Sequence, residues 1–378
     1  SKEASGSLTA AGGDAKAAAL LKRVAVSGGK SVFIEFVREA AGGNPSCPAL
    51  LAAIWATLGW EPLIKRSISR ITFAALPWYS RIFSSFVGCS ASAAKHGKDS
   101  FCGVKNEELI NGWTFTDAAF LALIGRKPDE HERFEFSMLL GLIISNGPGT
   151  ISAQGCKGGV SADGPEDPQR VQINKAFIGF LTHTGFAHGG NGYEAIAFLI
   201  DRFKDKGLKD PSSRKHGVDL KSVADEYAGW YAKYKVEQKA FGNIEYMKVP
   251  CVNHPVFKGK EVNYDPRERF VSALFEEKGV YNVFLDFYHN LVRSLFENKV
   301  SSNVYCVNVD AVIAVILLKI VWKAFNSGKM TAGEVESAAF TTFLFGRMIG
   351  CAAEIDDHIN RGRNMDTRTP ASRCMFVG

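Results

Sequence analysis

Residues 307–322 read VNVDAVIAVILLKIVW and contain the most apolar run of the chain, placed directly after a carboxylate, Asp310. The run from Ala311 to Trp322 holds one charge, Lys319. It is shorter than the roughly 20 apolar residues that cross a bilayer, so it predicts a buried helix. Apolar residues recur at helical spacing along much of the sequence, and strand patterns are nearly absent. The sequence therefore predicts a large all-α protein.

Other helices are expected on both sides of this run. Residues 107–125 show helical spacing after a candidate N-cap, Thr116. Residues 155–168 (GCKGGVSADGPEDP) predict an exposed loop, and prolines interrupt short helical patterns in residues 32–85. Further helices are predicted at 133–145, 219–242, 266–278, 281–299, 310–326 and 331–358.

The composition limits the class of protein. Of 378 residues, 46% are hydrophobic and 22% are charged, which excludes a mainly disordered chain. The length suggests two domains or one large elaborated domain. The 45 basic and 39 acidic residues leave a net charge of +6 without a long basic block. This balance suits a small phosphate-bearing ligand and gives no support to nucleic-acid binding.

The cysteines and histidines point away from metal chemistry. The eight cysteines form no C-x-x-C, and the histidines show no H-E-x-x-H spacing. We therefore expect free thiols in a reducing compartment, a cytoplasmic location, no metal and no tightly bound cofactor. The sequence also lacks a phosphate-binding G-x-x-x-x-G-K-[ST] loop and the G-x-S-x-G of serine hydrolases.

Targeting and membrane signals are weak. Residues 1–30 are rich in Ala, Gly, Ser and Lys and predict a flexible lead-in, without the basic start and apolar core of a signal peptide. No run has the character expected of a transmembrane span. Residues 64–86 (IKRSISRITFAALPWYSRIFSSF) are basic and aromatic, which suits a membrane-surface helix. A helix pair that covers a core is the favoured interpretation, and no membrane partner is expected.

Three segments interrupt the helical pattern and offer polar groups. GFAHGGNG at 185–192 surrounds His188 with glycines, which let a backbone approach a ligand closely. VPCVNHPVFK at 249–258 holds His254, and DPR follows at 265–267. The third is the carboxylate before the apolar run. Each has a structural alternative, because a lone histidine is often structural and an aspartate before a helix is usually an N-cap.

Arg347 lies inside another apolar segment, AAFTTFLFGRMIGCAAEI at 338–355. A buried guanidinium is costly without an anionic partner. The position therefore predicts either a carboxylate ligand or an internal acid beside Arg347.

Taken in order, these segments resemble the citrate synthase superfamily. The shared features are a histidine in a glycine-rich turn, a histidine followed by D-P-R, N-V-D before an apolar helix, and G-R-x-x-G. The superfamily includes citrate and methylcitrate synthases, citryl-CoA lyase and the C-terminal module of ATP citrate lyase. The resemblance covers roughly residues 105–373. It extends to E-L-I-x-G-x-[ST]-F-x-[ED] at 108–117 and to SNGPGTISA at 145–153.

The resemblance implies an enzyme that makes or breaks a carbon–carbon bond between acetyl-CoA and oxaloacetate through an enolate. Asp310 would remove the α-proton of the thioester. His188 would donate a hydrogen bond to the thioester oxygen, and His254 would donate to the ketone oxygen of the keto acid. Such chemistry needs a positioned base and oxyanion-type donors.

The resemblance also implies the binding residues. Arg267, Arg347 and Arg368 would bind substrate carboxylates, because arginine forks match carboxylates well. Arg368 would reach in from the second subunit of a homodimer, with Arg373 as a rival. Coenzyme A, as part of the substrate, would contact the backbone at Val252 and Asn253 and the side chain of Lys258.

Two departures from the family pattern affect the substrate. Cys251-Val-Asn-His254 stands where the family has G-x-G-H, and Asn146 stands where the synthases carry a further substrate-binding histidine. Asn146 donates hydrogen bonds but cannot be cationic, so the second substrate stays open. His183 is a rival of His188. The other histidines are assigned to surface or structural positions, namely His96, His131, His216, His289 and His358.

The implied architecture is a large helical domain with a smaller helical domain inserted into it and the active site in the cleft between them. The expected bounds are 31–191 and 306–378 for the large domain and 192–305 for the small one. Citryl-CoA lyase and citrate synthase activity are open alternatives. So are a methylcitrate-type synthase and a non-catalytic scaffold or module of a larger assembly.

Overall fold

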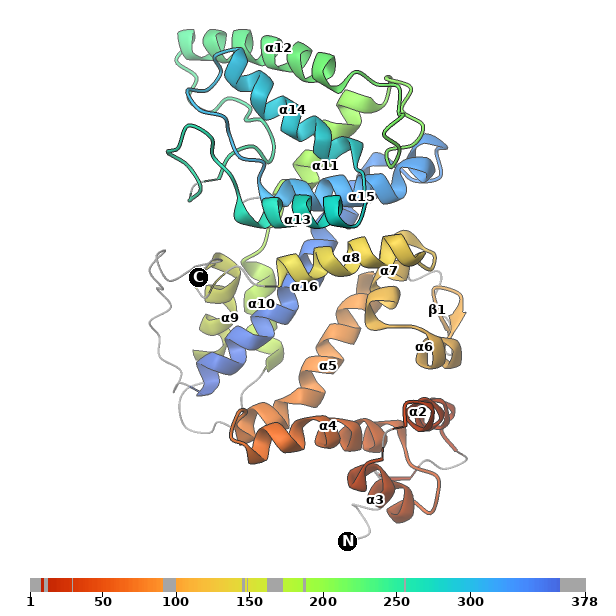
Figure 1. Cartoon of the computed structure of the whole chain (residues 1–378). Coiled ribbons are helices and arrows are strands. Elements are labelled where there is room, and N and C mark those ends of the chain that lie inside the picture. The colour runs from red at the N-terminus through yellow and green to blue at the C-terminus, as the bar shows by residue number, and fades with distance from the viewer. Residues whose placement is uncertain are drawn as a thin grey trace. The chain divides into compact units, whose positions relative to one another are not determined.

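The computed structural model describes residues 8–9, 13–28, 30–90, 100–144, 147, 149–161, 173–185, 188–254 and 256–360. Within these ranges the regular secondary structure is almost entirely helical, and the strands β1 (Ser100–Phe101) and β2 (Val104–Lys105) form one short antiparallel pair. The all-α prediction is therefore confirmed. The helices (Figure 1) are α2 (Ala15–Val26), α3 (Val32–Ala40), α4 (Cys47–Ile64), α5 (Arg70–Ser90), α6 (Asn106–Gly112), α7 (Phe115–Ile124), α8 (Glu130–Ile143), α9 (Ile151–Ser161), α10 (Ile173–Thr182), α11 (Asn191–Phe203), α12 (Leu220–Ala240), α13 (Pro266–Glu277), α14 (Val283–Glu297), α15 (Val309–Asn326) and α16 (Ala332–Asn360).

The predicted helix over 107–125 is two helices, α6 and α7. Thr114 begins α7 through a capping box with Asp117, in which each side chain binds the other residue's backbone N–H. The prediction of Thr116 as the cap is therefore wrong. Thr114 is the cap because Asp117 stands three residues later, which is the spacing that a capping box requires.

Two predicted irregular segments are partly helical. The loop expected at 155–168 belongs to α9 as far as Ser161, and residues 162–168 lie outside the described residues. Part of the predicted flexible lead-in is also a helix, because α2 is capped by the side chain of Asp14 and buries Ala17 and Ala19. The lead-in prediction is therefore wrong for residues 15–26.

The prolines of residues 32–85 interrupt the helices less than expected. α4 continues through Pro62, and α5 continues through Pro77. Each proline removes one backbone donor, yet both lie inside helices that continue past them. Gly59 of α4 lies against the ring of Phe73 of α5, where an added Cβ would stand 2.9 Å from ring atoms.

The described chain forms two compact units, each considered by itself. Unit 1 contains residues up to 133, 152–181 and 348–360, and unit 2 contains 134–151 and 182–347. The predicted small domain, 192–305, lies wholly inside unit 2. The predicted domain bounds and the cleft between those domains stay predictions.

Unit 1 has two packing regions. Around its N-terminal helices, Ala17, Ile34 and Leu50 form the centre of a small apolar cluster that joins α2, α3 and α4. Elsewhere α9 and α10 approach so closely that an added Cβ on Gly179 would stand 2.2 Å from the carbonyl oxygen of Gly155. Glycine is needed there because of this helix contact.

Unit 2 packs around α15. Residues Ala311 to Leu318 are all buried, so the prediction of a buried helix is confirmed. α11 and α14 pack against α15, and α12 packs along α14 (Figure 1). Rings of Phe203, Phe284 and Trp322 pack edge to face at 5.2 Å between centroids. This packing holds the C-terminal half of α15, whose first turn carries Asp310.

Two helices are long and apolar enough to cross a membrane by length and composition, α4 and α16. The expectation that no segment has this character is therefore wrong. In α16, 67% of the apolar window is buried, which is typical of a core helix, whereas in α4 only 17% is buried.

Candidate active site

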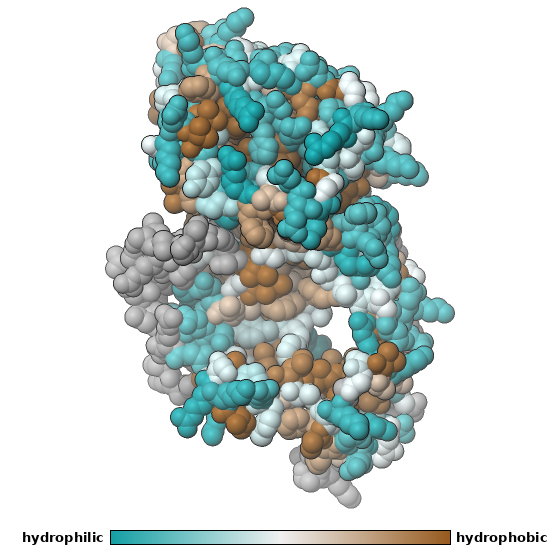
Figure 2. Space-filling model, viewed as in Figure 1, coloured by the Kyte–Doolittle hydropathy of each residue, from teal (hydrophilic) through white to brown (hydrophobic). Residues whose placement is uncertain are grey.

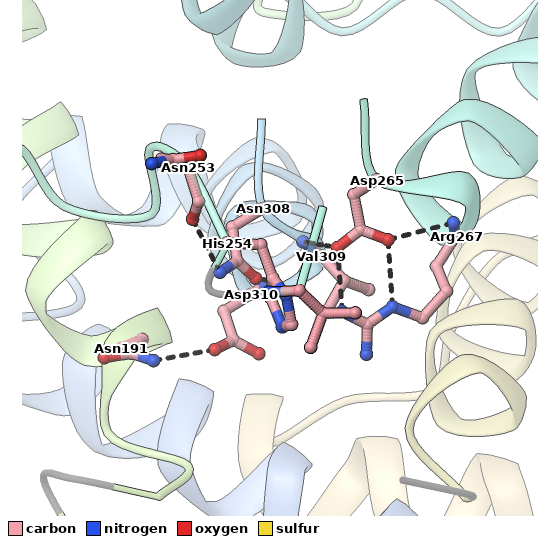
Figure 3. Close-up of polar contacts among 9 residues, drawn as sticks. Asn191, Asn253, His254, Asp265, Arg267, Asn308, Val309 and Asp310 are labelled. Atoms are coloured by element: carbon pink, nitrogen blue, oxygen red, sulfur yellow. Dashed lines mark hydrogen bonds and ion pairs between the residues drawn. The ribbon is translucent and has the colours of Figure 1, made fainter. Parts of the chain in front are cut away.

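Asp310 lies in the first turn of α15, and a neighbouring helix holds its side chain. The cap of this helix is Asn308, whose side-chain oxygen accepts from the backbone N–H of Asp310 at 3.1 Å. The structural alternative, in which Asp310 is itself the N-cap, is therefore wrong. Its own carboxylate accepts a hydrogen bond from Nδ2 of Asn191, the first residue of α11, at 2.9 Å (Figure 3).

Burial raises the pKa of Asp310 above its ordinary value, while the Asn191 hydrogen bond and the nearby Arg267 and His254 lower it. The burial effect is the largest, so the net direction is upward. A carboxylate with a raised pKa is a stronger base, which suits the removal of a proton from a weak carbon acid. The raised pKa also allows the group to hold a proton and return it.

His254 is held in one tautomer. Its Nδ1 accepts a hydrogen bond from the backbone N–H of Val256 at 3.1 Å, so the neutral ring carries its hydrogen on Nε2. The ring stacks on Phe257 at 4.8 Å. Burial, and then Arg267, lowers the pKa of His254. At neutral pH the side chain is therefore an uncharged donor at Nε2.

The backbone before His254 takes the conformation that favours glycine. Cys251 and Asn253 have φ of 55° and 72°, although neither is glycine. These are the two positions where the family pattern has glycines, so the segment keeps the left-handed backbone without the residues that favour it. Hydrogen bonds hold it, since Asn253 donates to the Cys306 carbonyl at 2.7 Å and Asn308 donates to the Cys251 carbonyl at 2.9 Å.

Arg267 is bound to an aspartate within its own motif. Its Nε and Nη2 donate to the two carboxylate oxygens of Asp265 at 2.9 and 2.7 Å. Asp265 is fully buried, caps α13 and accepts from the backbone N–H of Val309 at 3.2 Å (Figure 3). Asp265 thus ties the first turns of α13 and α15 together and orients Arg267 near Asp310.

His188 is also neutral. It follows a tight turn in which Gly185 and His188 exchange backbone hydrogen bonds of 3.0 Å. Its ring meets Phe343 edge to face at 5.5 Å between centroids. Burial, and then the charge of Arg347, lowers the pKa of His188 from 6.5 to about 4. The ring is therefore uncharged at neutral pH.

Arg347 is 1% exposed. Its Nη1 donates to the carbonyl oxygen of Ile144 at 2.8 Å, and its Nη2 donates to Oγ1 of Thr150 at 3.0 Å. Ile144 and Thr150 flank the segment around Asn146 that the resemblance predicted to bind substrate. Phe343, whose ring contacts His188, lies one helical turn before Arg347 on α16.

The remaining predicted residues divide into described and undescribed ones. Val252 is half-buried and pairs with Val307, and Lys258 is exposed. The rival His183 is exposed, and its Nδ1 lies 3.1 Å from Oγ1 of Thr182. Three residues lie outside the described residues, namely Asn146, Arg368 and Arg373.

The structure therefore brings His254, Arg267 and Asp310 together, and it places His188 beside Arg347. All belong to unit 2. Within the described ranges, no group of three or more histidine, cysteine and acidic side chains is placed to hold a metal ion. The six cysteines whose side chains are described are free thiols.

Sequence reasoning did not assign roles to Asn191, Asp265 and Asn308. Each lies next to a residue that was singled out, in GGNG, DPR and NVD respectively. The sequence signal that could have found them was that each stands directly beside a residue already assigned a role. Their roles depend on contacts between distant segments, which a single sequence does not show.

No protein-family model and no curated protein matches the sequence. Among solved structures, citryl-CoA lyase from Hydrogenobacter thermophilus aligns with a TM-score of 0.50 and 19% identity, over 74% of this chain and 89% of that chain. The fold resembles that of citryl-CoA lyase. ATP citrate lyase from Methanothrix soehngenii, in complex with citrate and coenzyme A, aligns with a TM-score of 0.50 and 19% identity, over 77% of this chain and 41% of that chain. The citrate synthase-like architecture is thus confirmed at the level of the fold.

Proposed function

We propose that the chain is an enzyme that cleaves or forms the carbon–carbon bond of a citryl-CoA-like thioester. The products of cleavage would be acetyl-CoA and oxaloacetate. The observation that carries the proposal is the Asp310 carboxylate, held by Asn191 beside an uncharged His254 and Arg267 in a fold like that of citryl-CoA lyase.

In the condensation direction, the ionised Asp310 carboxylate takes an α-proton from the acetyl group. The electron pair of that C–H bond moves to the thioester oxygen, where a donor such as the neutral His188 stabilises the developing charge. The α-carbon then attacks the ketone carbon of the keto acid. Nε2–H of His254 donates to the ketone oxygen, which becomes the hydroxyl group.

In the cleavage direction the same groups act in reverse order. The hydroxyl proton passes to solvent water while Nε2–H of His254 stabilises the alkoxide oxygen. The carbon–carbon bond then breaks as that oxygen becomes the ketone, and the acetyl-CoA enolate takes a proton from the protonated Asp310. The raised pKa of Asp310 favours this protonated form. A preorganised base and donor each contribute roughly 10²–10³-fold in rate.

Arginines supply the charge that a di- or tricarboxylate needs. We place Arg347 and Arg267 on substrate carboxylates, with Asp265 orienting Arg267 through its fork. Lys258 is exposed four residues after His254, where a cation would meet the phosphates of coenzyme A. Arg368 from the second subunit of a homodimer is a further proposed contact.

The experiment is incubation of the purified chain with citryl-CoA, with the products identified by mass spectrometry. Acetyl-CoA with oxaloacetate would support the lyase reaction, and citrate with free coenzyme A would support a synthase that hydrolyses the thioester. A matched control is the Asp310→Asn variant, which should form neither. Citryl-CoA that the unaltered chain leaves intact would overturn the proposed substrate.

A further inference from the structure

Unit 2 has a small cavity lined by α13, α14 (Figure 1) and the segment 304–307, which we call the α13–α14 cavity. Its volume is about 140 Å³. The buried part of its wall is apolar, since Val292, Cys306 and Val307 are 6%, 2% and 3% exposed. A protein cavity of roughly 150 Å³ holds a ring of the size of benzene. The α13–α14 cavity therefore has room for one small ring.

Another part of the wall is held by backbone hydrogen bonds between two chain segments. The N–H of Asn263 donates to the carbonyl oxygen of Val304 at 2.9 Å, and the N–H of Val304 donates to the carbonyl oxygen of Glu261 at 3.0 Å. The side chain of Asn263 is buried, and its Oδ1 accepts from the N–H of Lys260 at 3.0 Å. The cavity is therefore formed without a ligand, as is usual for sites that bind small molecules.

Two arginines give the rim of the cavity its charge. Arg269 of α13 and Arg293 of α14 line the cavity and are exposed, and in the described part of the chain neither forms an ion pair. The carboxylate in the wall belongs to Glu268, which is 2% exposed. It already accepts from Nε2 of His289 at 2.8 Å and from Oγ of Ser272 at 2.5 Å. The charge that a ligand would meet is therefore positive.

Other acidic residues near these helices lie outside the wall. Glu297, one turn after the arginine of α14, accepts from Nζ of Lys221 at 2.7 Å. Asp265, one turn before the arginine of α13, accepts from Arg267. Glu261 is exposed, and none of the three acids lines the cavity. They leave the two rim arginines available to an anion.

An exposed ring brings a third cation to the rim. Tyr264 is 46% exposed and lines the cavity. The guanidinium of Arg269 lies 6.0 Å from the centroid of its ring, and Nζ of Lys260 lies 5.6 Å from it. Figure 2 shows a mostly hydrophilic surface over the helices of unit 2, so the apolar wall of the cavity differs from its surroundings. An apolar wall below several cations suits a ligand that has a ring and more than one negative charge.

The thiol in the wall does not act as a nucleophile at neutral pH. Burial, and then the nearby Asp265 and Glu268, raises the pKa of Cys306 to about 11. The reactive form of cysteine is the thiolate, so the protonated thiol contributes to the apolar wall. The features of the cavity therefore indicate binding.

We propose that the α13–α14 cavity binds a small phosphate monoester. A ring-sized part of the ligand would lie against the apolar wall, and the phosphate would lie at the rim on Arg269 and Arg293. A phosphate monoester carries about −1.5 to −2 charges near pH 7 and three acceptor oxygens, and arginine forks match that geometry. A carboxylate has one charge and two oxygens. This proposal does not rest on the proposed reaction.

The α13–α14 cavity is separate from the candidate active site. None of His254, Arg267 and Asp310 lines it. The two sites share the segment 304–307, which leads directly into Asn308, the cap of α15. Binding to the cavity is therefore measurable with variants that leave the candidate active site unaltered.

The test is isothermal titration calorimetry of the full chain with phenyl phosphate, in a phosphate-free buffer at low ionic strength. Phenyl phosphate should bind more tightly than inorganic phosphate, which lacks the ring, and more tightly than benzoate, which has the ring and a single charge. Arg269→Gln and Arg293→Gln should each weaken its binding by about tenfold. Both arginines are exposed, so these variants should keep the fold.

The matched control is Arg66→Gln with Arg70→Gln, which removes two exposed arginines from unit 1. Its affinity for phenyl phosphate should equal that of the unaltered chain. Unchanged affinity in both rim variants would overturn the proposal, as would a loss in the control alone. A loss in Lys258→Gln with none in the rim variants would instead place the phosphate at the predicted coenzyme A contact.

The other two probes test the chemistry of the ligand. Benzoate that binds as tightly as phenyl phosphate would contradict a site for phosphate. Inorganic phosphate that binds as tightly would contradict a monoester and assign the rim to the free anion.

Discussion

Helices α4 and α15 both have 18 residues and are mostly apolar, but they have opposite surroundings. In α15 the stretch from Ala311 to Leu318 is buried throughout, and the one lysine of its apolar run, Lys319, pairs with Glu135. In α4 most residues are exposed or half-buried, and unpaired arginines follow it. Apolar composition alone does not distinguish a core helix from an exposed one. The charges and the packing around each helix do.

The core helix also positions chemistry. Because α15 is fixed on several sides, its first turn holds Asp310 against Asn191 and within the field of His254 and Arg267. The exposed helix has no comparable polar network. The comparison therefore predicts that substitutions at the start of α15 change activity, whereas those at exposed positions of α4 leave it unchanged.

The largest effect is expected for Asp310→Asn. The proton-transfer group is lost, so kcat for citryl-CoA should fall by about 10³-fold or more. Leu58→Gln on α4 is the matched control and should keep full activity. Steady-state kinetics of the two variants test the contrast, and a loss of less than about tenfold for Asp310→Asn would refute the assigned base.

The same variant should be more stable than the unaltered chain at pH 7. The folded-state pKa of Asp310 is raised above 3.8, so the ionised carboxylate destabilises the fold above that pH. Removal of the charge should raise the free energy of unfolding, with the gain vanishing below pH 3.8. Asp201→Asn is the control with the opposite sign, because ion pairs lower the pKa of Asp201. Thermal unfolding curves at several pH values measure both.

Truncation in the two helices should differ sharply in its effect on stability. Leu317 of α15 is fully buried, so Leu317→Ala should cost about 2–5 kcal/mol of unfolding free energy. Leu58 of α4 is 62% exposed, so Leu58→Ala should change it by about 0.5 kcal/mol at most. Denaturant titration of both variants provides the measurement. Equal costs would show that α4 is a core element.

A smaller effect is expected for Asn191→Ala. The hydrogen bond from Asn191 lowers the pKa of Asp310, so its loss raises that pKa further. In the condensation direction Asp310 acts ionised, and activity falls as it becomes protonated. The acid limb of kcat/KM should therefore move to higher pH by roughly one unit. Asn290→Ala on α14, which removes an amide bound to Asp286, should leave the limb in place.

The smallest effect is expected for Asn253→Gly. Asn253 has φ of 72°, and its side-chain oxygen is buried without a partner among the described residues. Glycine adopts this backbone without strain and removes the unpaired oxygen, so the variant should gain about 1 kcal/mol of unfolding free energy. Chemical denaturation measures the gain. A loss of stability would show that the asparagine side chain supports the loop.

Part of this arrangement was predictable from the sequence. The apolar spacing of 310–326 predicted α15, and the order of His188, His254, Asp310 and Arg347 predicted the fold that the structure confirms. Helical periodicity is local, so one sequence shows it. The roles proposed for these residues stay predictions.

The rest depended on contacts that the sequence does not show. Asn308 caps α15 in place of Asp310, Asp265 binds Arg267, and Cys251 adopts a left-handed backbone. Each results from segments that are distant in the chain and meet only after folding. The exposure of α4 was also missed. Its apolar composition is that of a core helix, and only the folded structure shows that most of it is not buried.

The most direct test of the central assignment is cleavage of citryl-CoA in D₂O, with acetyl-CoA analysed by mass spectrometry. If Asp310 returns a solvent-derived proton to the acetyl-CoA enolate, the product of the unaltered chain should carry one deuterium in its methyl group, and Asp310→Asn should yield no product. Labelled acetyl-CoA formed at an equal rate by the Asp310→Asn variant would contradict the account, because another group would then perform the proton transfer.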